Sequence, residues 1–272
     1  MIRLALVTAV AFSLTAGTGQ PPQSEASQAL LALAAKYLTS YDRQFSAVVS
    51  EERYEQSGHG PKGVVTGHRL LRSDLLLVNS GEAGSLCFRD VYEVDGKAIR
   101  DRNQRLMDLF QHPTGDAIDQ ATKIREEGAR FNIGTLSRTV NDPTMALAFL
   151  RDVNQRRSIF DLAGESTVNG VRTRVLRFRE DSQPRLIGTP DESPASGRFW
   201  IDQGTGRIVR TELVLSAREA RGTITVTYGP QEKLAGLWVP VRMEERYAVG
   251  STQTIDCVAT YSNFRQFNVT VR

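Results

Sequence analysis

The spacing of apolar residues changes from a helical period to a strand period near residue 45. Between residues 24 and 41, apolar side chains recur at intervals of three and four, which places them on one face of a helix. Ser24 or Ser27 can cap this helix, because a serine hydroxyl accepts a hydrogen bond from a backbone N–H of the first turn. The predicted apolar stripe consists of Leu30, Leu33, Ala34, Tyr37, Leu38 and Tyr41.

After residue 45, apolar and polar residues alternate in several short segments. The clearest is 223–228, in which Ile224, Val226 and Tyr228 alternate with threonines. The segments 239–243 and 267–271 repeat the pattern. Because successive side chains of a strand point to opposite faces, this alternation predicts a sheet with one buried and one wet face.

Turn residues predict how these strands connect. Asp95-Gly96 and Asn169-Gly170 lie between β-rich segments, and a type I′ turn needs positive φ at both central positions. The stretch 203–206, Gln-Gly-Thr-Gly, indicates a third, slightly longer hairpin. No alternation of strands with crossover helices is present, so the sheet is predicted to be antiparallel.

Two helices are predicted in the middle of the chain. The first extends from Thr114 to Gly128 and carries acidic residues in its first turn. The second begins at Asp142-Pro143, and its body, 145–150, is apolar on every side. A helix with no polar face is buried all round. We therefore expect an α+β fold in which a curved antiparallel sheet holds a helical plug.

The first nineteen residues have the pattern of a secretory signal peptide. Arg3 precedes an uncharged, mostly apolar stretch, Leu4–Ala16, and small residues follow to Gly19. The alternative, an uncleaved anchor, is disfavoured because this stretch is shorter than the ~20 residues that cross a bilayer. Residues 1–19 are then removed, and 20–272 remain as a single exported domain, periplasmic or secreted, with no stable membrane span.

Composition limits the class of partner. The 272 residues are 40% hydrophobic and 24% charged, with a formal net charge of +3. These values exclude disordered, collagen-like and multi-span membrane proteins. No run of five or six like charges occurs, so the sequence predicts no nucleic-acid partner.

The two cysteines, Cys87 and Cys257, both lie in strand-like segments. In an exported chain they can form a disulfide, and the alternative is that each is a small core residue. They do not form a CxxC pair, and His59, His68 and His112 have no ligand-like spacing to them. The sequence therefore predicts no metal and no cofactor.

Catalytic motifs are missing from the sequence as well. Gly164–Val168 lacks the second glycine of a nucleophile elbow, and Gly58–Gly63 lacks the spacing and hydroxyl of a phosphate-binding loop. Glu51 and Glu52 are adjacent, so on a strand they point to opposite faces and cannot act on one substrate bond. We interpret both as solvated strand charges, and we predict that the protein is not an enzyme.

Large apolar residues provide the remaining candidate site. Trp200 and Trp238 lie on late strands, whereas Phe110, Phe149 and Leu150 lie on the predicted middle helices. One interpretation is a closed core between sheet and helices. The other is that sheet and helices part to admit an acyl chain, so that these residues line an apolar cavity.

The stretch 197–210, Gly-Arg-Phe-Trp-Ile-Asp-Gln-Gly-Thr-Gly-Arg-Ile-Val-Arg, resembles the outer-membrane lipoprotein-sorting (LolA-like) superfamily. The similar features are a strand centred on a tryptophan, an Asp…Thr-Gly turn and a return strand that ends in arginine. Leu237–Pro240 and Tyr261–Arg265 are similar to the late strands of that superfamily.

The resemblance implies an incomplete β-barrel whose open side is covered or filled by helices. It also implies an apolar interior that shelters lipid or lipoprotein acyl groups in the periplasm, so the expected partner is a lipid or an acylated protein. The alternative is a non-catalytic envelope sensor or scaffold domain that binds a protein partner.

Overall fold

The computed structural model describes residues 24–44, 47–79, 85–102, 105, 117–134, 142–187, 193–217 and 220–266. The predicted signal peptide, Phe110, His112 and the predicted strand at 267–271 lie outside these residues. The elements are α1 (Glu25–Gln44), β1 (Ala47–His59), η1 (Pro61–Gly63), β2 (Val65–Asn79), β3 (Ser85–Val94), β4 (Lys97–Ala98), α3 (Ala117–Ala129), η3 (Met145–Leu150), α4 (Asp152–Gln155), β5 (Ser158–Val168), β6 (Val171–Glu180), β7 (Ser196–Asp202), β8 (Ile208–Ser216), β9 (Ala220–Gln231), η4 (Glu232–Leu234), β10 (Leu237–Val249) and β11 (Gln253–Gln266).

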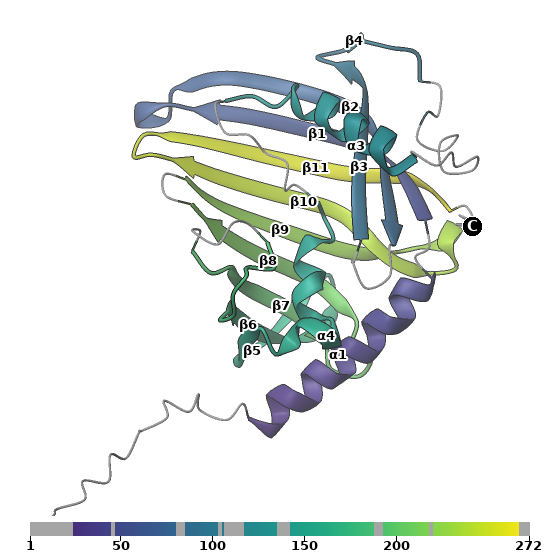
Figure 1. Ribbon diagram of the computed structural model, residues 1–272, viewed down its shortest axis with the longest axis vertical. Coiled ribbons are helices and arrows are strands. Elements are labelled where there is room, and N and C mark those ends of the chain that lie inside the picture. The colour runs from purple at the N-terminus through teal and green to yellow at the C-terminus, as the bar shows by residue number, and fades with distance from the viewer. Residues whose placement is uncertain are drawn as a thin grey trace, which may run out of the picture.

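The strands form one 11-stranded sheet in the order β4-β3-β2-β1-β11-β10-β9-β8-β7-β6-β5 (Figure 1). Every neighbouring pair is antiparallel, as the turn residues predicted. Consecutive strands pair, except β4 and β5, and the sheet is made continuous by the pairing of β1 with β11. β4 and β5 form the two edges, so the sheet stays open and is not a closed barrel.

The two predicted tight hairpins are confirmed. Asp95 and Gly96 have φ of 49° and 79° between β3 and β4. Asn169 and Gly170 have φ of 49° and 80° between β5 and β6. Positive φ at both central residues gives the turn a twist that matches the flanking strands.

The two faces of the sheet differ as the alternation predicted. Ile224, Val226 and Tyr228 are buried, whereas Thr223 and Thr225 are partly exposed. The apolar residues of α1 and η3 belong to the same buried cluster as these strand residues, and both helices lie on one side of the sheet in Figure 1. We call this side the inner face and the opposite side the outer face.

Helix α1 begins where the sequence predicted. The backbone N–H of Ser27 donates to Oγ of Ser24 at 3.2 Å, which satisfies one donor of the first turn. The buried stripe differs from the prediction, because Leu31 is buried whereas Leu33 and Tyr37 are half-buried. The helix therefore turns a slightly different face toward the sheet than the spacing alone indicated.

The buried middle segment is a 3-10 helix and not the predicted α-helix. Met145–Leu150 forms η3, and the chain bends at Arg151 into the single α-turn of α4. Asp142 still fixes the start, because its Oδ1 accepts hydrogen bonds from N and Oγ1 of Thr144, both at 2.7 Å. Short 3-10 segments are common connectors, and burial of the apolar side chains here outweighs the local preference for an α-helix.

Helix α3 covers part of the β3 edge. β4 pairs only with Glu93 and Val94 of β3, and α3 packs against the rest of that strand. Gly128, which the sequence placed at the helix end, lies inside the last turn, where a Cβ would be 2.9 Å from the carbonyl oxygen of Arg89. Glycine thus permits the close approach, and the helix shields the strand edge from other chains.

Candidate functional site

The inner face of β5–β9 is apolar and is covered by residues 145–155, which we call the plug. Phe149 and Leu150 are completely buried. The Phe149 ring lies 4.7 Å from that of Phe178 between centroids, and Phe178 stacks on Phe199 at 4.9 Å. Aromatic pairs at these separations add to the energy of burial. These side chains therefore fill the space between the sheet and the plug, which is the closed core of the first interpretation.

Polar contacts join the plug to α1. Nε and Nη2 of Arg151 donate to the two carboxylate oxygens of Asp42 at 3.1 and 2.8 Å, and we call this pair the latch. Nε2 of Gln155 donates to the carbonyl oxygen of Leu31 at 3.3 Å. The Arg151 side chain is only 10% exposed, so water competes weakly for this bidentate contact.

The chain just before the plug is attached to the sheet. The hydroxyl of Tyr228 on β9 donates to the carbonyl oxygen of Pro143 at 2.8 Å. Burial raises the pKa of the Asp142 carboxyl, although hydrogen bonds from Thr144 and the charge of Arg89 oppose the rise. Asp142, just before the plug, thus has a carboxyl group whose charged form is disfavoured by burial.

The turn between β7 and β8 forms the rim of the site beside α1. The guanidinium of Arg207 lies 4.3 Å from the ring centroid of Trp238, and its Nη2 donates to Asp202 at 2.8 Å. Burial raises the pKa of Tyr37 on α1 to about 12, and the charge of Arg207 opposes this rise. The half-buried Trp238 therefore lies at the rim and not in the interior.

The prediction that Trp200 lines the cavity was wrong. Phe199 is buried on the inner face, so the next residue, Trp200, points to the outer face, where it is half-buried. The guanidinium carbons of Arg198 and Arg210 each lie 5.8 Å from its ring centroid. Of the five predicted residues, the structure brings together Phe149 and Leu150, places Trp238 at the rim and does not describe Phe110.

The interpretation of Glu52 as a solvated charge was also wrong. Glu52 is buried on the inner face, where Nε and Nη2 of Arg89 bind its two oxygens. Oγ of Ser73 donates to the same carboxylate at 2.8 Å. The signal was present in the sequence, because strand alternation places Glu52 on the same face as the buried Tyr54.

A second buried carboxylate extends this polar region onto β10. The hydroxyls of Tyr54 and Tyr247 donate to Glu245 at 2.5 and 3.1 Å, and the Arg89 guanidinium lies 5.1 Å from the Tyr54 ring centroid. The inner face of β1–β3 and β10 thus carries a buried polar network among core residues such as Leu75 and Met243. Buried networks of this kind fix side-chain positions because each member holds another.

Three carboxylates lie side by side on the outer face of β1–β3. Glu51 is opposite Asp74, and Asp74 is opposite Asp90. Adjacent like charges repel across a ladder. Arg102 compensates by binding Glu51 at 2.8 Å and Asp74 at 2.6 Å, and Arg265 of β11 approaches Asp74 at 3.3 Å.

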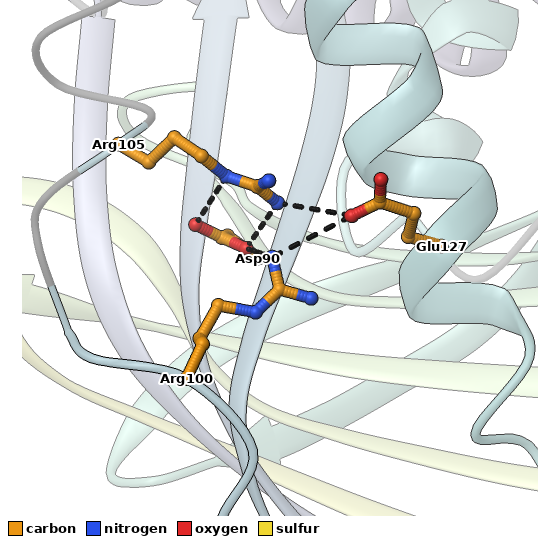
Figure 2. Close-up of polar contacts among 4 residues, drawn as sticks. All are labelled: Asp90, Arg100, Arg105 and Glu127. Atoms are coloured by element: carbon orange, nitrogen blue, oxygen red, sulfur yellow. Dashed lines mark hydrogen bonds and ion pairs between the residues drawn. The ribbon is translucent and has the colours of Figure 1, made fainter.

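Figure 2 shows how the third carboxylate is neutralised. Arg100 and Arg105 each bind Asp90, at 3.0 and 2.8 Å, and both also reach Glu127 of α3, at 3.5 and 3.3 Å. The cluster joins the chain after β4, the outer face of β3 and helix α3. We therefore assign it a structural role in holding α3 against the sheet edge.

A pocket of about 250 Å³ lies at the ends of β1, β2 and β11 and is separate from the plug. Gly58 and Gly67, directly opposite each other in the ladder, leave room for it, and Ile133 and Ile255 give it an apolar wall. Nε2 of His59, also in its lining, is 3.6 Å from a carboxylate oxygen of Asp256. The predicted cavity and this pocket do not coincide.

Cys87 and Cys257 do not form a disulfide in the structure. Cys87 on β3 is opposite Leu77 of β2, which is opposite Val48 of β1. Val48 is opposite Gln266 of β11, so Cys87 lies level with Gln266 and not with Cys257. Three strand spacings of ~4.8 Å already exceed the ~7 Å between Cα atoms that a disulfide bridges. The predicted alternative, two small residues within the sheet, is the arrangement found.

Within the described ranges, no group of three or more His, Cys, Asp and Glu side chains is arranged to hold a metal ion. Among the helices of the same ranges, none combines the length and the hydropathy that a membrane span needs. His68 is exposed near the start of β2.

Comparison with known proteins gives similarity at the level of structure. No family model and no curated protein matches the sequence. A putative outer membrane lipoprotein-sorting protein domain from Vibrio parahaemolyticus is 13% identical, with 88% of this chain and 92% of that chain covered and a TM-score of 0.38. A LolA superfamily protein from Nitrosomonas europaea is 10% identical, with 90% and 94% covered and a TM-score of 0.34. The Pseudomonas aeruginosa MucA/MucB complex gives 12% identity, 86% and 99% coverage and a TM-score of 0.21.

With TM-scores of 0.38 and below, these similarities do not bear on function.

Proposed function

We propose that the protein is a non-catalytic periplasmic binding protein that shelters a lipid or lipoprotein acyl group. The group binds to the apolar inner face of β5–β9 after the plug moves away. The observation that carries this proposal is the chemistry of the plug: Phe149 and Leu150 cover the sheet through apolar contact, whereas Arg151 holds the plug to α1 through the latch.

The free energies gained and lost when an acyl chain replaces the plug support this proposal. Burial of a side chain such as Phe149 or Leu150 contributes about 1.5–3 kcal/mol each. An acyl chain of ~12 carbons gains ~0.8 kcal/mol for each buried methylene, or ~10 kcal/mol in all. Such a chain can therefore compensate for the contacts that the plug loses.

The test measures the affinity of a fluorescent fatty acid for the full chain and for two variants. Arg151→Ala removes the latch, and Arg177→Ala removes an exposed ion pair with Asp161 as the matched control. If the latch contributes about 1–2 kcal/mol to the closed form, its loss raises the apparent affinity by roughly 5- to 30-fold. The control keeps the wild-type affinity. Absence of probe binding to all three folded proteins contradicts the proposal.

The alternative is an envelope sensor or scaffold domain that binds a protein partner. The complete burial of Phe149 and Leu150 favours it, because a permanently closed core needs no ligand. Mass spectrometry of an organic extract distinguishes the two functions when the protein is purified from a bacterial periplasm without detergent. Stoichiometric acyl lipid supports the carrier, and a folded protein without lipid supports the scaffold.

A further inference from the structure

A continuous row of arginine and threonine side chains, with Trp200 at its β7 end, crosses the outer face from β7 to β2. The register places each member opposite the next on the neighbouring strand. All of them alternate along their strands with inner-face residues. The row ends at β2, because the next residue in the ladder is Glu93 of β3, which binds Arg72 at 3.3 Å. The arginine row, as we call it, consists of Trp200, Arg210, Thr227, Arg242, Thr260, Arg53 and Arg72.

Two features of this row are unfavourable for the fold alone. Arg53 is directly opposite Arg72, although like charges in that position destabilise a sheet, and the ion pairs of Arg53 with Glu55 and of Arg72 with Glu93 offset this repulsion only through exposed contacts. Nε of Arg210 is buried and lacks a hydrogen-bond partner in the described part of the chain, and its guanidinium lies beside the Trp200 ring. A buried donor without an acceptor costs stability unless a ligand supplies one.

The spacing of the cations indicates the shape of a partner. Arg210, Arg242 and Arg53 lie on every second strand, at β8, β10 and β1. With ~4.8 Å between strands, they repeat about every 10 Å. A polyproline II helix advances ~3.1 Å per residue with three residues per turn, so every third side chain lies on one face at intervals of about 9 Å.

The surroundings of the row favour a narrow chain over a flat surface. Glu212, Glu244 and Glu55 form a parallel row on the same strands, two residues further along each strand. Glu244 and Glu55 also pair with the arginines of their own strands, in exposed contacts that exchange readily. An anionic membrane would meet these carboxylates together with the arginines, whereas a single extended chain can follow the arginines alone.

We propose that the arginine row binds an extended, polyproline II-like segment of a partner protein that carries Asp or Glu at every third residue. The carboxylates accept hydrogen bonds from the guanidinium groups, and the hydroxyl of the partly exposed Thr260 donates to the backbone of the segment, whereas Thr227 is buried beneath it. This inference does not depend on the acyl-binding proposal, because it uses the opposite face of the sheet.

The experiment uses a labelled peptide of Glu-Pro-Pro repeats that spans the ~30 Å between β7 and β2. A second peptide has the same composition with its glutamates adjacent. Fluorescence anisotropy compares wild type with two triple variants of equal charge. The row variant is Arg53→Gln/Arg210→Gln/Arg242→Gln, and the matched control is Arg177→Gln/Arg179→Gln/Arg246→Gln, which changes arginines of the same face outside the row.

Wild type and the control variant should bind the repeat peptide at least tenfold more tightly than the row variant does, because each lost charged contact weakens binding several-fold. Binding should also disappear as ionic strength approaches ~1 M, where the Debye length is about 3 Å. The peptide with adjacent glutamates should bind more weakly.

Equal loss in the two variants, or equal affinity for the two peptides, overturns the proposal. Vesicles of phosphatidylglycerol and phosphatidylcholine provide the other arm of the test. If wild type binds them in a row-dependent way but does not bind the repeat peptide, the surface recognises a membrane and the proposal is wrong. Thermal unfolding of both triple variants confirms that each is folded.

Discussion

Arg151 of the plug binds Asp42 of α1 through two hydrogen bonds, although the residues are 109 positions apart in the sequence. The pair joins the first helix to the middle of the chain across the apolar face of the sheet. Because this pair connects them, α1 and the plug cover the sheet as one unit.

Arg151→Ala should lower the free energy of unfolding by about 1–3 kcal/mol, because it removes a bidentate contact to Asp42 whose Arg151 side chain is only 10% exposed. Arg177→Ala is the control, and the loss there should be below about 1 kcal/mol because both partners are exposed. Urea denaturation measures both values. Equal losses would mean that the latch contributes no more than a surface pair.

Phe149→Ala should destabilise the protein by about 3–5 kcal/mol, since it leaves a cavity beside Phe178. Trp200→Ala should cost much less, although it removes a larger side chain, because Trp200 lies half-buried on the outer face. The two midpoints of urea denaturation at equal m-value decide the order. A larger loss for Trp200 would contradict the assignment of the two faces.

Gly206 should tolerate no side chain. Its φ is 73°, and a Cβ would lie 2.4 Å from the carbonyl oxygen of Leu33 in α1. Gly206→Ala should therefore displace α1 from the β7–β8 turn and cost well over 1 kcal/mol. Gly170→Ala is the matched control, because Gly170 has φ of 80° with nothing within 4 Å, so only the backbone strain of about 1 kcal/mol applies. Similar losses in thermal unfolding would rule out the α1 contact as the cause.

Asp142→Asn should raise stability at neutral pH. Burial raises the pKa of Asp142 in the folded protein, so its contribution to stability is present below the unfolded pKa of about 3.9 and is lost as the pH rises through the folded value. Asparagine keeps the oxygen that accepts from Thr144 and carries no charge. The melting temperature of the variant should exceed that of wild type at pH 7, and the gap should close in acid. A variant that is less stable at pH 7 would refute this account.

Glu51→Gln should show the opposite pH dependence. Burial tends to raise the pKa of Glu51, but hydrogen bonds from Asn263 and Arg102 outweigh it and lower the pKa. The stability that the carboxylate contributes is therefore present above its unfolded pKa and is lost as the pH falls through the lower folded value. The variant should be less stable than wild type at pH 7 and equal to it in strong acid. A difference that persists at low pH would show that the loss is not due to charge.

The hairpins and the sheet were predictable because their signals are local. Asp95-Gly96 and Asn169-Gly170 fix turns by their own backbone preferences, and the alternation at 223–228 fixes which side chains are buried. Pairing of β1 with β11 was not predictable in this way, since no local signal connects strands from the two ends of the chain.

Burial of the candidate residues was predicted in part. Phe149 and Leu150 were identified correctly as buried because the segment around them has no polar face. Trp200 was assigned to the wrong face because hydrophobicity was considered without strand alternation, which pairs it with Arg198 on the outer face. The Arg151–Asp42 contact could not be predicted, because it depends on how two distant helical segments meet.

The most direct test of the account is hydrogen exchange of backbone amides with and without a saturating long-chain fatty acid. Displacement of the plug predicts that the η3 amide of Leu147, which donates to the carbonyl oxygen of Thr144 at 3.0 Å, loses protection when the fatty acid binds. Amides of β6 and β7 beneath the plug should remain protected. Unchanged protection of η3 with fatty acid bound would contradict the account, because the acyl group would then lie elsewhere on the protein.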